Sequence, residues 1–270
     1  MKKILTFVLA MILMLTAAAS AATFKHGFDY SYPPYSYLND DGKMGGFDVE
    51  VCQAVCEYLG WEYEAVPFNW DAKDAELQSG SADCIWSGFT IEGREDGYTW
   101  SIPYSNNTQV IVTMADSGIA TLADLAGKVV GVQIDTSAQQ LLIDEGAQVE
   151  LAATFADLLT FETYTIAFND LAAGAIDAIA VDITTATYIL NNMKNPEDFV
   201  VLEEKLGTER YGIGFRIADT ELRDQVNAAL IVLAMEGTIA EIANSNPEYA
   251  DILPYLTLTP ENVVAAMNAQ

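Results

Sequence analysis

Short apolar runs alternate with amphipathic segments along the chain after residue 22. Short apolar runs between turn signals are typical of buried strands, whereas apolar positions three and four residues apart are typical of helices. Phe47, Val51 and Val55 follow the helical spacing, and Gly60 ends that pattern. We predict strands at 24–28 and 62–66, a third strand leading into Ser87, and helices at 48–59 and 71–78. Strands alternating with helices indicate a parallel α/β layer.

A β-rich run at 108–114 precedes a second series of the same kind, so we interpret it as a strand that crosses into a second lobe. The remaining pattern predicts a short helix capped by Thr121, strands at 129–133, 148–152, 178–181 and 199–202, helices at 137–145, 164–173 and 184–193, a return strand at 211–216, and helices at 221–235 and 238–244.

We therefore expect an α/β fold with two doubly wound lobes joined by two crossing strands. Lobe 1 would comprise residues 23–112 and 212–270, and lobe 2 residues 113–211. Ligands of open α/β sheets bind beyond the carboxyl ends of the strands, which places the expected site in the cleft between the lobes. Two crossing strands would also permit hinge closure over a ligand.

The first 22 residues have the composition of a cleavable signal peptide. A basic start at Lys2 and Lys3 is followed by an apolar core at 4–16 and by small residues at 17–22. We predict cleavage after Ala21 or Ala22. Since no cysteine lies there, we expect no lipid anchor, and we expect an exported protein, periplasmic or secreted.

The charge balance is strongly acidic. The chain has 12 Lys and Arg against 39 Asp and Glu, a formal net charge of -27. This balance excludes nucleic acid as an expected partner, because phosphate backbones bind cationic surfaces. The net negative charge repels anions, so an anionic ligand needs a specific cation at its binding site. Each buried cation is therefore a stronger candidate for a binding residue.

The three cysteines are Cys52, Cys56 and Cys84. Two interpretations stay open: three buried thiols acting as small core residues, or a disulfide from Cys84 to one of the other two. The single His26 and the cysteine spacing give no usual ligand set for a metal, so we expect none.

Two stretches carry recognisable binding chemistry. After the strand that ends at Ser87 and Gly88, Thr90 and Arg94 follow closely, and a guanidinium is a planar fork that matches a carboxylate. A second apolar strand, at 178–181, delivers Asp182 to its carboxyl end. A carboxylate receptor together with a cation receptor matches the two charged ends of a free α-amino acid.

The chain resembles the extracytoplasmic solute-binding proteins of ABC transporters, in the branch that binds polar amino acids. The matching segments, in family order, are 29–35, 45–48, 87–94, 100–104, 127–132 and 174–182. The resemblance covers nearly the whole chain after residue 22. It implies a two-lobed binding-protein fold, no cofactor, and a permease as partner, and we expect a monomer.

The resemblance also implies roles for particular residues. In the first binding turn, Arg94 would hold the ligand's α-carboxylate with help from Thr90 and the backbone at Gly88. Here the turn is one residue shorter than the family's common form, and Glu92 replaces a Thr. The flanking turn residues assigned to the ligand site are Ser87 and Phe89.

In lobe 2 the resemblance assigns the carboxylate's other side to the start of a helix. The residues are Gln133, Thr136, Ser137 and the backbone at Ala138, with Asp135 in place of the family's Gly. Thr136 or Ser137 would also serve as an N-cap.

Asp182 would receive the α-ammonium of the ligand. The alternative for Asp182 is capping the helix that starts near Thr184, a role that Asp also performs well.

Three residues are assigned to the ligand's side chain. Asp29 favours a polar or basic side chain, while Tyr32 and Trp70 supply flat apolar walls. Core packing is the alternative for Trp70.

The leading interpretation is a receptor that captures a free amino acid and delivers it to an ABC permease. Its rival is an enzyme on the same fold, a cyclic-carboxylate dehydratase, in which Glu92 would be the candidate general acid. A third is the ligand-binding part of a membrane sensor.

Overall fold

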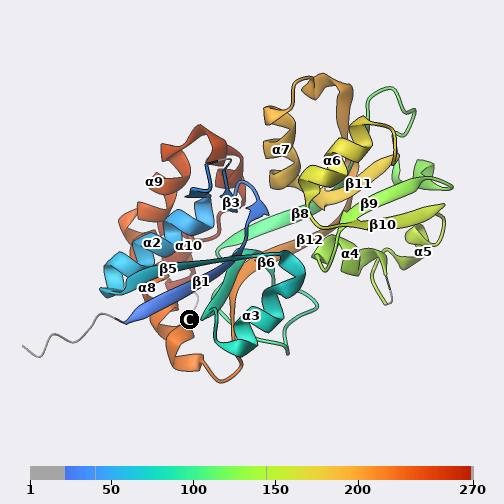
Figure 1. The fold of residues 1–270 in the computed structure, drawn as a ribbon. Helices are drawn as coiled ribbons and strands as arrows, with labels where there is room; N and C mark the ends of the chain where they lie inside the picture. Colours follow the sequence, from blue (N-terminus) through green and yellow to red (C-terminus); the bar gives the residue numbers. More distant parts are fainter. Residues whose placement is uncertain (1–21, 40, 144, 269–270) are drawn as a thin grey trace, which may run out of the picture.

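The computed structural model describes residues 22–39, 41–143 and 145–268, and it has the two-lobed architecture expected. Figure 1 shows the lobes side by side, with two long strands running between them. The strands of both lobes form one continuous sheet in the order β10-β9-β11-β8-β12-β6-β1-β5, and β7 pairs with β12. The predicted signal peptide, apart from Ala22, lies outside the described residues.

The sheet of lobe 1 is parallel at its core. β1 (Thr23–Asp29) lies between β5 (Glu62–Phe68) and β6 (Cys84–Thr90) and runs parallel to both. Parallel strands share the direction of their carboxyl ends, so Asp29 and the Ser87–Thr90 end of β6 point to the same edge. A small antiparallel sheet follows β1, formed by β2 (Ser31–Tyr32), β3 (Ser36–Leu38) and β4 (Met44–Gly45).

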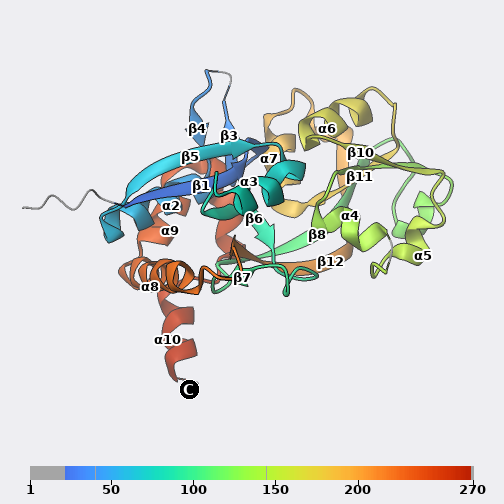
Figure 2. The same cartoon turned by 60° about the horizontal axis from the view of Figure 1, so that its bottom comes forward.

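The sheet of lobe 2 repeats this arrangement. β9 (Val129–Gln133) lies between β10 (Asp157–Phe161) and β11 (Ala178–Asp182) and is parallel to both. Gln133 and Asp182 therefore end neighbouring strands at one edge. That edge faces the carboxyl ends of the lobe 1 strands (Figures 1 and 2).

The crossing strands are β8 (Ser105–Met114) and β12 (Phe199–Phe215). They pair antiparallel from Ser105 and Tyr211 to Met114 and Phe199, with register irregularities near Lys205. β8 also pairs with β11, and β12 with β6. The predicted lobe boundaries, at 112/113 and 211/212, fall inside these two strands.

Helices cover both faces of the sheet. In lobe 1 these are α2 (Phe47–Leu59), η1 (Trp70–Ala72), α3 (Lys73–Ser79), α8 (Thr220–Glu236) and α9 (Thr238–Ser245). In lobe 2 they are η2 (Leu122–Leu125), α4 (Ser137–Leu142), α5 (Val149–Ala152), α6 (Tyr164–Ala172), α7 (Ile183–Asn192) and η3 (Pro196–Asp198). Gly60 and Gly237 end α2 and α8 in the left-handed conformation, as their positions predict.

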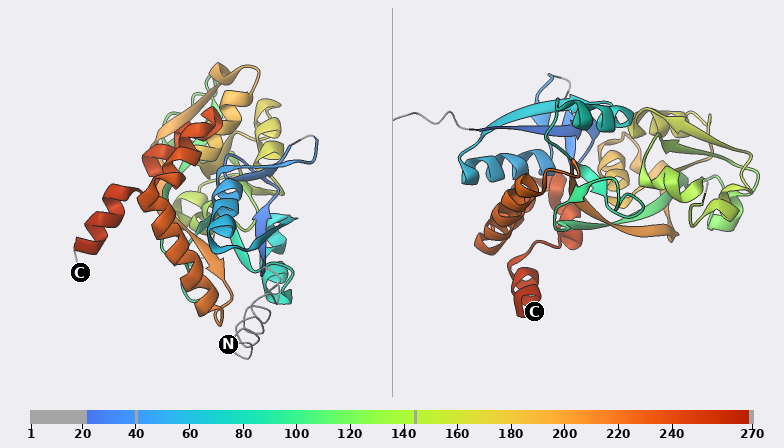
Figure 3. Two further views of the ribbon diagram at one scale, coloured as in Figure 1. Left: turned by 90° about the vertical axis from the view of Figure 1, so that its left-hand side faces the viewer. Right: turned by 90° about the horizontal axis from the view of Figure 1, so that it is seen from below.

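The C-terminal segment returns to lobe 1. η4 (Pro247–Tyr255) packs beside α9, and α10 (Pro260–Asn268), which the sequence pattern did not predict, projects from α8 (Figures 2 and 3). Among the described residues no single helix is long and apolar enough to cross a membrane; α8 and α9 together pass that test by length and composition but are bent by 71°.

One strand prediction was wrong. Residues 149–152 form the short helix α5, and the strand lies later, at Asp157–Phe161. A run of five residues is too short to distinguish the two periods, and β10 is an edge strand with exposed positions, which weakens its apolar signal. The strands predicted at 199–202 and 211–216 are the two ends of the single strand β12, whose solvent-exposed middle contains Glu203 and Glu204.

The cysteines lie inside lobe 1 as buried free thiols: Cys52 and Cys56 on α2 and Cys84 on β6. Of the two open interpretations, the structure shows the one with small core residues.

Candidate functional site

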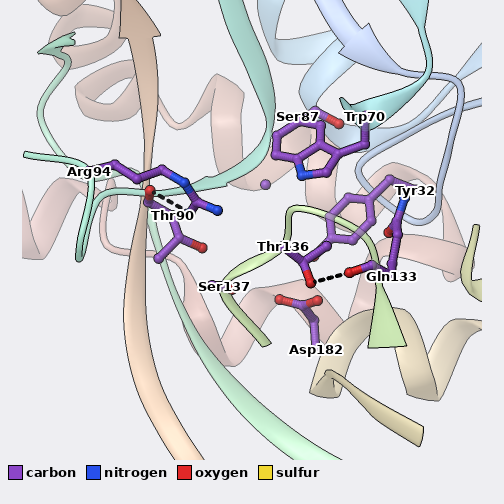
Figure 4. A pocket seen from close by; sticks show the side chains of 10 residues that line it. Tyr32, Trp70, Ser87, Thr90, Arg94, Gln133, Thr136, Ser137 and Asp182 are labelled. Atoms are coloured by element: carbon purple, nitrogen blue, oxygen red, sulfur yellow. Dashed lines mark hydrogen bonds between the residues drawn. The ribbon is translucent and has the colours of Figure 1, made fainter. Parts of the chain in front are cut away.

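A pocket lies where the strand ends of the two lobes meet, with about 270 Å³ of space not filled by protein atoms, part of which is open to solvent. Its lining residues are Tyr32, Trp70, Ser87, Gly88, Thr90, Arg94, Gln133, Thr136, Ser137 and Asp182. Figure 4 shows Arg94 and Thr90 on one side, Trp70 and Tyr32 across from them, and Asp182 close to Thr136. The residues come from both lobes, so a ligand held here would be enclosed by both.

Three residues assigned to the site from sequence do not line this pocket. Phe89 is fully buried against Trp70 and Trp100, and the guanidinium of Arg94 lies 5.2 Å from its ring centre. Ala138 is buried in the core of lobe 2. Asp29 lies behind Gln133.

Arg94 is a buried cation held by backbone oxygens. It donates to the carbonyl of Thr90 at 3.3 Å and to that of Asp135 at 3.1 Å. With the amide of Gln140 oriented to satisfy both groups, its oxygen accepts from Nη2 and Nε of Arg94 at 3.1 and 3.3 Å. Burial lowers the pKa of Arg94, and Asp135 and Glu209 oppose that shift. The shortened turn thus brings the guanidinium into the pocket, where a carboxylate would form a charge-assisted pair.

Gly88 shapes the turn and is held from behind by a residue that sequence reasoning missed. Its φ is +55°, and an added Cβ would lie 2.6 Å from the ring of Tyr32, so only glycine fits. Its N–H donates to Asp48 at 2.7 Å and to the hydroxyl of Tyr104 at 3.2 Å. This amide is therefore engaged by Asp48 in the structure.

Asp48 is a buried carboxylate at the start of α2. It also accepts from the Tyr104 hydroxyl at 2.7 Å. Burial raises its pKa to about 7, although both hydrogen bonds oppose the shift. Asp48 belongs to the Gly45–Asp48 segment, one of those that resemble the family, and this resemblance is the sequence signal that could have identified it.

The loop after β9 makes contacts between the two lobes. Asp135 has a φ of +58°, the only positive value for a non-glycine residue in the part of the chain described, at the position where the family has Gly. Its carbonyl accepts from Trp70 Nε1 at 2.9 Å, and its carboxylate forms an ion pair with the buried Lys73. Thr136 caps α4 through Gln139 N at 3.3 Å, and its hydroxyl donates to the carbonyl of Gln133 at 2.7 Å.

Asp182 ends β11 with its carboxylate in a buried polar network. Its Oδ1 accepts from Asn107 Nδ2 at 2.7 Å, Gln109 Nε2 at 2.6 Å and the Tyr211 hydroxyl at 2.6 Å. No side-chain cap bond to α7 is formed, so the capping alternative is not what the structure shows. The network leaves Oδ2 as the oxygen available to a cation in the pocket.

The far end of the pocket is aromatic. The hydroxyl of Tyr32 lies 3.0 Å from that of Tyr211, and the Trp70 ring packs edge-on against Phe89. Gln133 is fully buried between the lobes: its Nε2 donates to Asp29 Oδ2 at 2.8 Å, while its Oε1 has no partner among the described residues.

Asp29 orients Gln133 from outside the pocket. Its Oδ1 accepts from Ser31 N at 2.8 Å, and burial raises its pKa to about 6. Gln133, held by Asp29, therefore lines the pocket in place of the carboxylate that the sequence suggested. In the part of the chain that the structure covers, no group of His, Cys, Asp and Glu could hold a metal ion.

Comparison with known proteins agrees with this geometry. The sequence model of the bacterial extracellular solute-binding proteins, family 3, matches residues 24–246. The L-cystine-binding protein TcyJ of Escherichia coli K12 is 30% identical over 233 residues, covering 85% of this chain and 84% of TcyJ. The ABC transporter arginine-binding protein 1 of the same organism is 27% identical over 241 residues, 87% of this chain and 95% of that protein.

Among solved structures, a substrate-binding protein of an ABC uptake transporter from Streptococcus pneumoniae, with bound histidine, has a TM-score of 0.77. It is 32% identical, and the match covers 83% of this chain and 91% of that chain. The expected two-lobed fold and the expected relationship are thereby confirmed. With a match across most of its length, this chain belongs to the bacterial extracellular solute-binding proteins, family 3.

Proposed function

We propose that this protein captures one free amino acid between its lobes and delivers it to the permease of an ABC transporter. The observation that carries the proposal is the pairing of opposite charges in one enclosed pocket, with Arg94 beside Thr90 and a buried Asp182. An α-carboxylate and an α-ammonium match these groups. Relatives named for binding cystine, arginine and histidine support the same ligand class.

For the side chain of the ligand we propose a preference for hydrogen-bond donors. The support is Gln133 Oε1, a buried acceptor without a partner among the described residues, next to Tyr32 and Trp70. A polar or cationic side chain with an apolar stem satisfies both the acceptor and the aromatic walls. Acidic side chains would leave this oxygen facing another acceptor.

We also propose an exported protein that works as a monomer, with a cleaved leader and a periplasmic location, and a role in binding without catalysis. Glu92, the candidate general acid of the enzyme alternative, instead accepts from Nε of Arg210 at 2.6 Å on the surface. An ion-paired, solvent-exposed carboxylate is poorly suited to protonate an enclosed ligand.

A thermal-shift screen tests the proposal directly. The chain from Ala22 onward would be screened against the twenty amino acids, ornithine, cystine and the cyclic carboxylate prephenate. A ligand that binds only the folded state stabilises it by about 4 kcal/mol at a thousandfold excess over Kd. We expect a shift with one or a few polar or basic amino acids. A shift with prephenate alone would favour the enzyme alternative, and no shift would refute the ligand class.

A further inference from the structure

A second buried carboxylate, Glu209, shares amide donors with Asp182. It lines a neighbouring cavity that has Thr90 and Ser137 in common with the pocket described above. It belongs to the crossing strand β12 and is 7% exposed. Its Oε1 accepts from Asn107 Nδ2 and Gln109 Nε2, each at 2.6 Å. The same two nitrogens donate to Oδ1 of Asp182 at 2.7 and 2.6 Å. Two carboxylates are thus bridged by one pair of amides.

The oxygens of these two amides are acceptors without a donor. Asn107 Oδ1 and Gln109 Oε1 are both buried and have no hydrogen-bond partner among the described residues. Buried acceptors are almost always paired in folded proteins, so two orphans in one cluster indicate a missing donor. An ammonium group carries three N–H donors and a positive charge, and it would supply both a donor and a cation to this group of acceptors.

The charged and titratable groups that face Glu209 come from several elements. They are Asp182 on β11, Arg94 after β6, Tyr164 on α6 and Tyr211 on β12. Burial, and then the negative charge of Asp182, raise the pKa of Glu209 to about 7, against the hydrogen bonds from Asn107, Gln109 and Ser137. Two amide-bridged carboxylates in a buried site therefore cannot both stay ionised cheaply without a cation.

We propose that Glu209 is the second carboxylate of the ligand's ammonium site, and that Glu209 holds a proton when the site is empty and releases it to solvent when the ammonium docks. This inference rests on the proposed function. One cation replaces another, so the buried charge of the pair stays balanced throughout the cycle. The doubly acidic site also selects against acidic ligands and against carboxylates that lack an amine.

The pair can be tested without any ligand because it does not depend on lobe closure. Its bridging partners lie on β8, and Asp182 lies on the neighbouring strand β11 of lobe 2. Glu209 pairs with Asn107 between β12 and β8, and Asp182 pairs with Gln109 between β11 and β8, so the four residues are neighbours in one sheet. The proton on Glu209 is therefore a property of the empty protein as well.

The first arm counts protons on binding. Isothermal titration calorimetry with L-arginine, L-histidine and L-cystine, in two buffers of different ionisation enthalpy, would be run at pH 6 and pH 8. We expect wild type to release close to one proton per bound ligand at pH 6 and to bind about tenfold more weakly there than at pH 8. Glu209→Gln should release none and should lose the pH dependence. Glu203→Gln, an exposed change of the same kind on the same strand, should behave as wild type.

The second arm uses the empty protein. For a carboxyl whose folded pKa is raised, the folded state binds the extra proton, so stability falls as pH rises between the unfolded pKa of about 4.5 and the folded pKa of about 7. We expect the unfolding midpoint of wild type to drop relative to that of Glu209→Gln over this window.

The two arms separate the possible failures. If none of the three probes binds, the proposed function fails for them while the second arm still tests the proton on Glu209. Tight binding by wild type without proton release, or equal release by Glu209→Gln, would overturn the inference. The number of protons released by wild type is measured without any variant. It would therefore still decide the inference if Glu209→Gln did not fold.

Discussion

At the scale of single residues, the ligand site depends on a few buried polar groups at strand ends. Arg94 and Asp182 could be predicted because each follows an apolar strand closely. Asp48 and Glu209 could not, because their partners are distant in sequence: Asp48 holds Gly88, 40 residues away, and Glu209 meets Asn107 across 102 residues. Local patterns carry no signal for such pairs. Burial and shared donors identify them once the fold is known.

Arg94 gives the most direct prediction at this scale. Arg94→Ala should abolish amino-acid binding in calorimetry, because the carboxylate loses its only buried guanidinium partner among the described pocket residues. Arg94→Lys should bind weakly, since a point charge lacks the planar fork.

Folding should be little affected in Arg94→Ala, because removing a buried charge, which burial disfavours, offsets the loss of its hydrogen bonds to two backbone carbonyls. Arg210→Ala is the matched control: it removes an exposed guanidinium paired with Glu92, and it should bind as wild type. Binding by Arg94→Ala within a few fold of wild type would contradict the assignment of the carboxylate.

At the scale of elements, most helices and strands were predictable because their apolar faces are long enough to show a period. The failures share a physical cause. β10 pairs only with β9 and leaves three of its five positions exposed, and the middle of β12 is exposed at the three residues between Leu202 and Leu206. Where solvent covers a strand, the hydrophobic pattern that marks it disappears.

The contact between α3 and the loop after β9 is a consequence of tertiary structure that no local pattern indicates. Lys73 at the start of α3 is buried and pairs with Asp135 of the other lobe, whose backbone also accepts from Trp70 and Arg94. These bonds exist only when the lobes are together. We therefore expect them to stabilise the closed form and to slow ligand release.

Replacing this ion pair tests the role of the contact. Lys73→Met keeps the apolar stem and should raise the ligand's dissociation rate about two- to tenfold, a modest effect because the Asp135 carboxylate is 43% exposed. Asp135→Asn should do the same, and the double variant should be no worse than either single variant. Lys128→Met, whose partner Asp177 lies in the same lobe, is the control. Stopped-flow release of ligand measures the rates, and additive effects in the double variant would show that the two residues act separately.

At the scale of the whole molecule, several titratable groups are buried and have shifted pKa values. Asp29 and Asp48 have pKa values raised by burial to about 6 and about 7, and burial with Asp182 raises that of Glu209 to about 7. His26 behaves oppositely. It is fully buried between Trp86 O at 2.7 Å and Tyr63 at 3.1 Å, and burial lowers its pKa to about 4.

These groups predict how stability depends on pH. Each raised carboxyl keeps its proton in the folded state, so its contribution is lost as pH rises from about 4 to about 7. The neutral His26 costs stability as pH falls from 6.5 toward 4, because only the unfolded chain then gains a proton. The three carboxyls stabilise the fold at low pH, and His26 alone destabilises it there. We therefore expect the unfolding free energy to be higher near pH 5 than near pH 8, by a few kcal/mol in order of magnitude.

The net charge of -27 supplies a competing cause, because repulsion among surface carboxylates also grows with pH. Salt distinguishes the two. Surface repulsion is screened at 0.5 M NaCl, where the Debye length is only about 4 Å, whereas protonation of enclosed carboxyls is screened far less. Urea unfolding at pH 5 and pH 8, with and without salt, should retain most of the difference in salt. A difference that salt removes would assign the pH dependence to the surface and would mean that the buried carboxyls titrate with nearly ordinary pKa values.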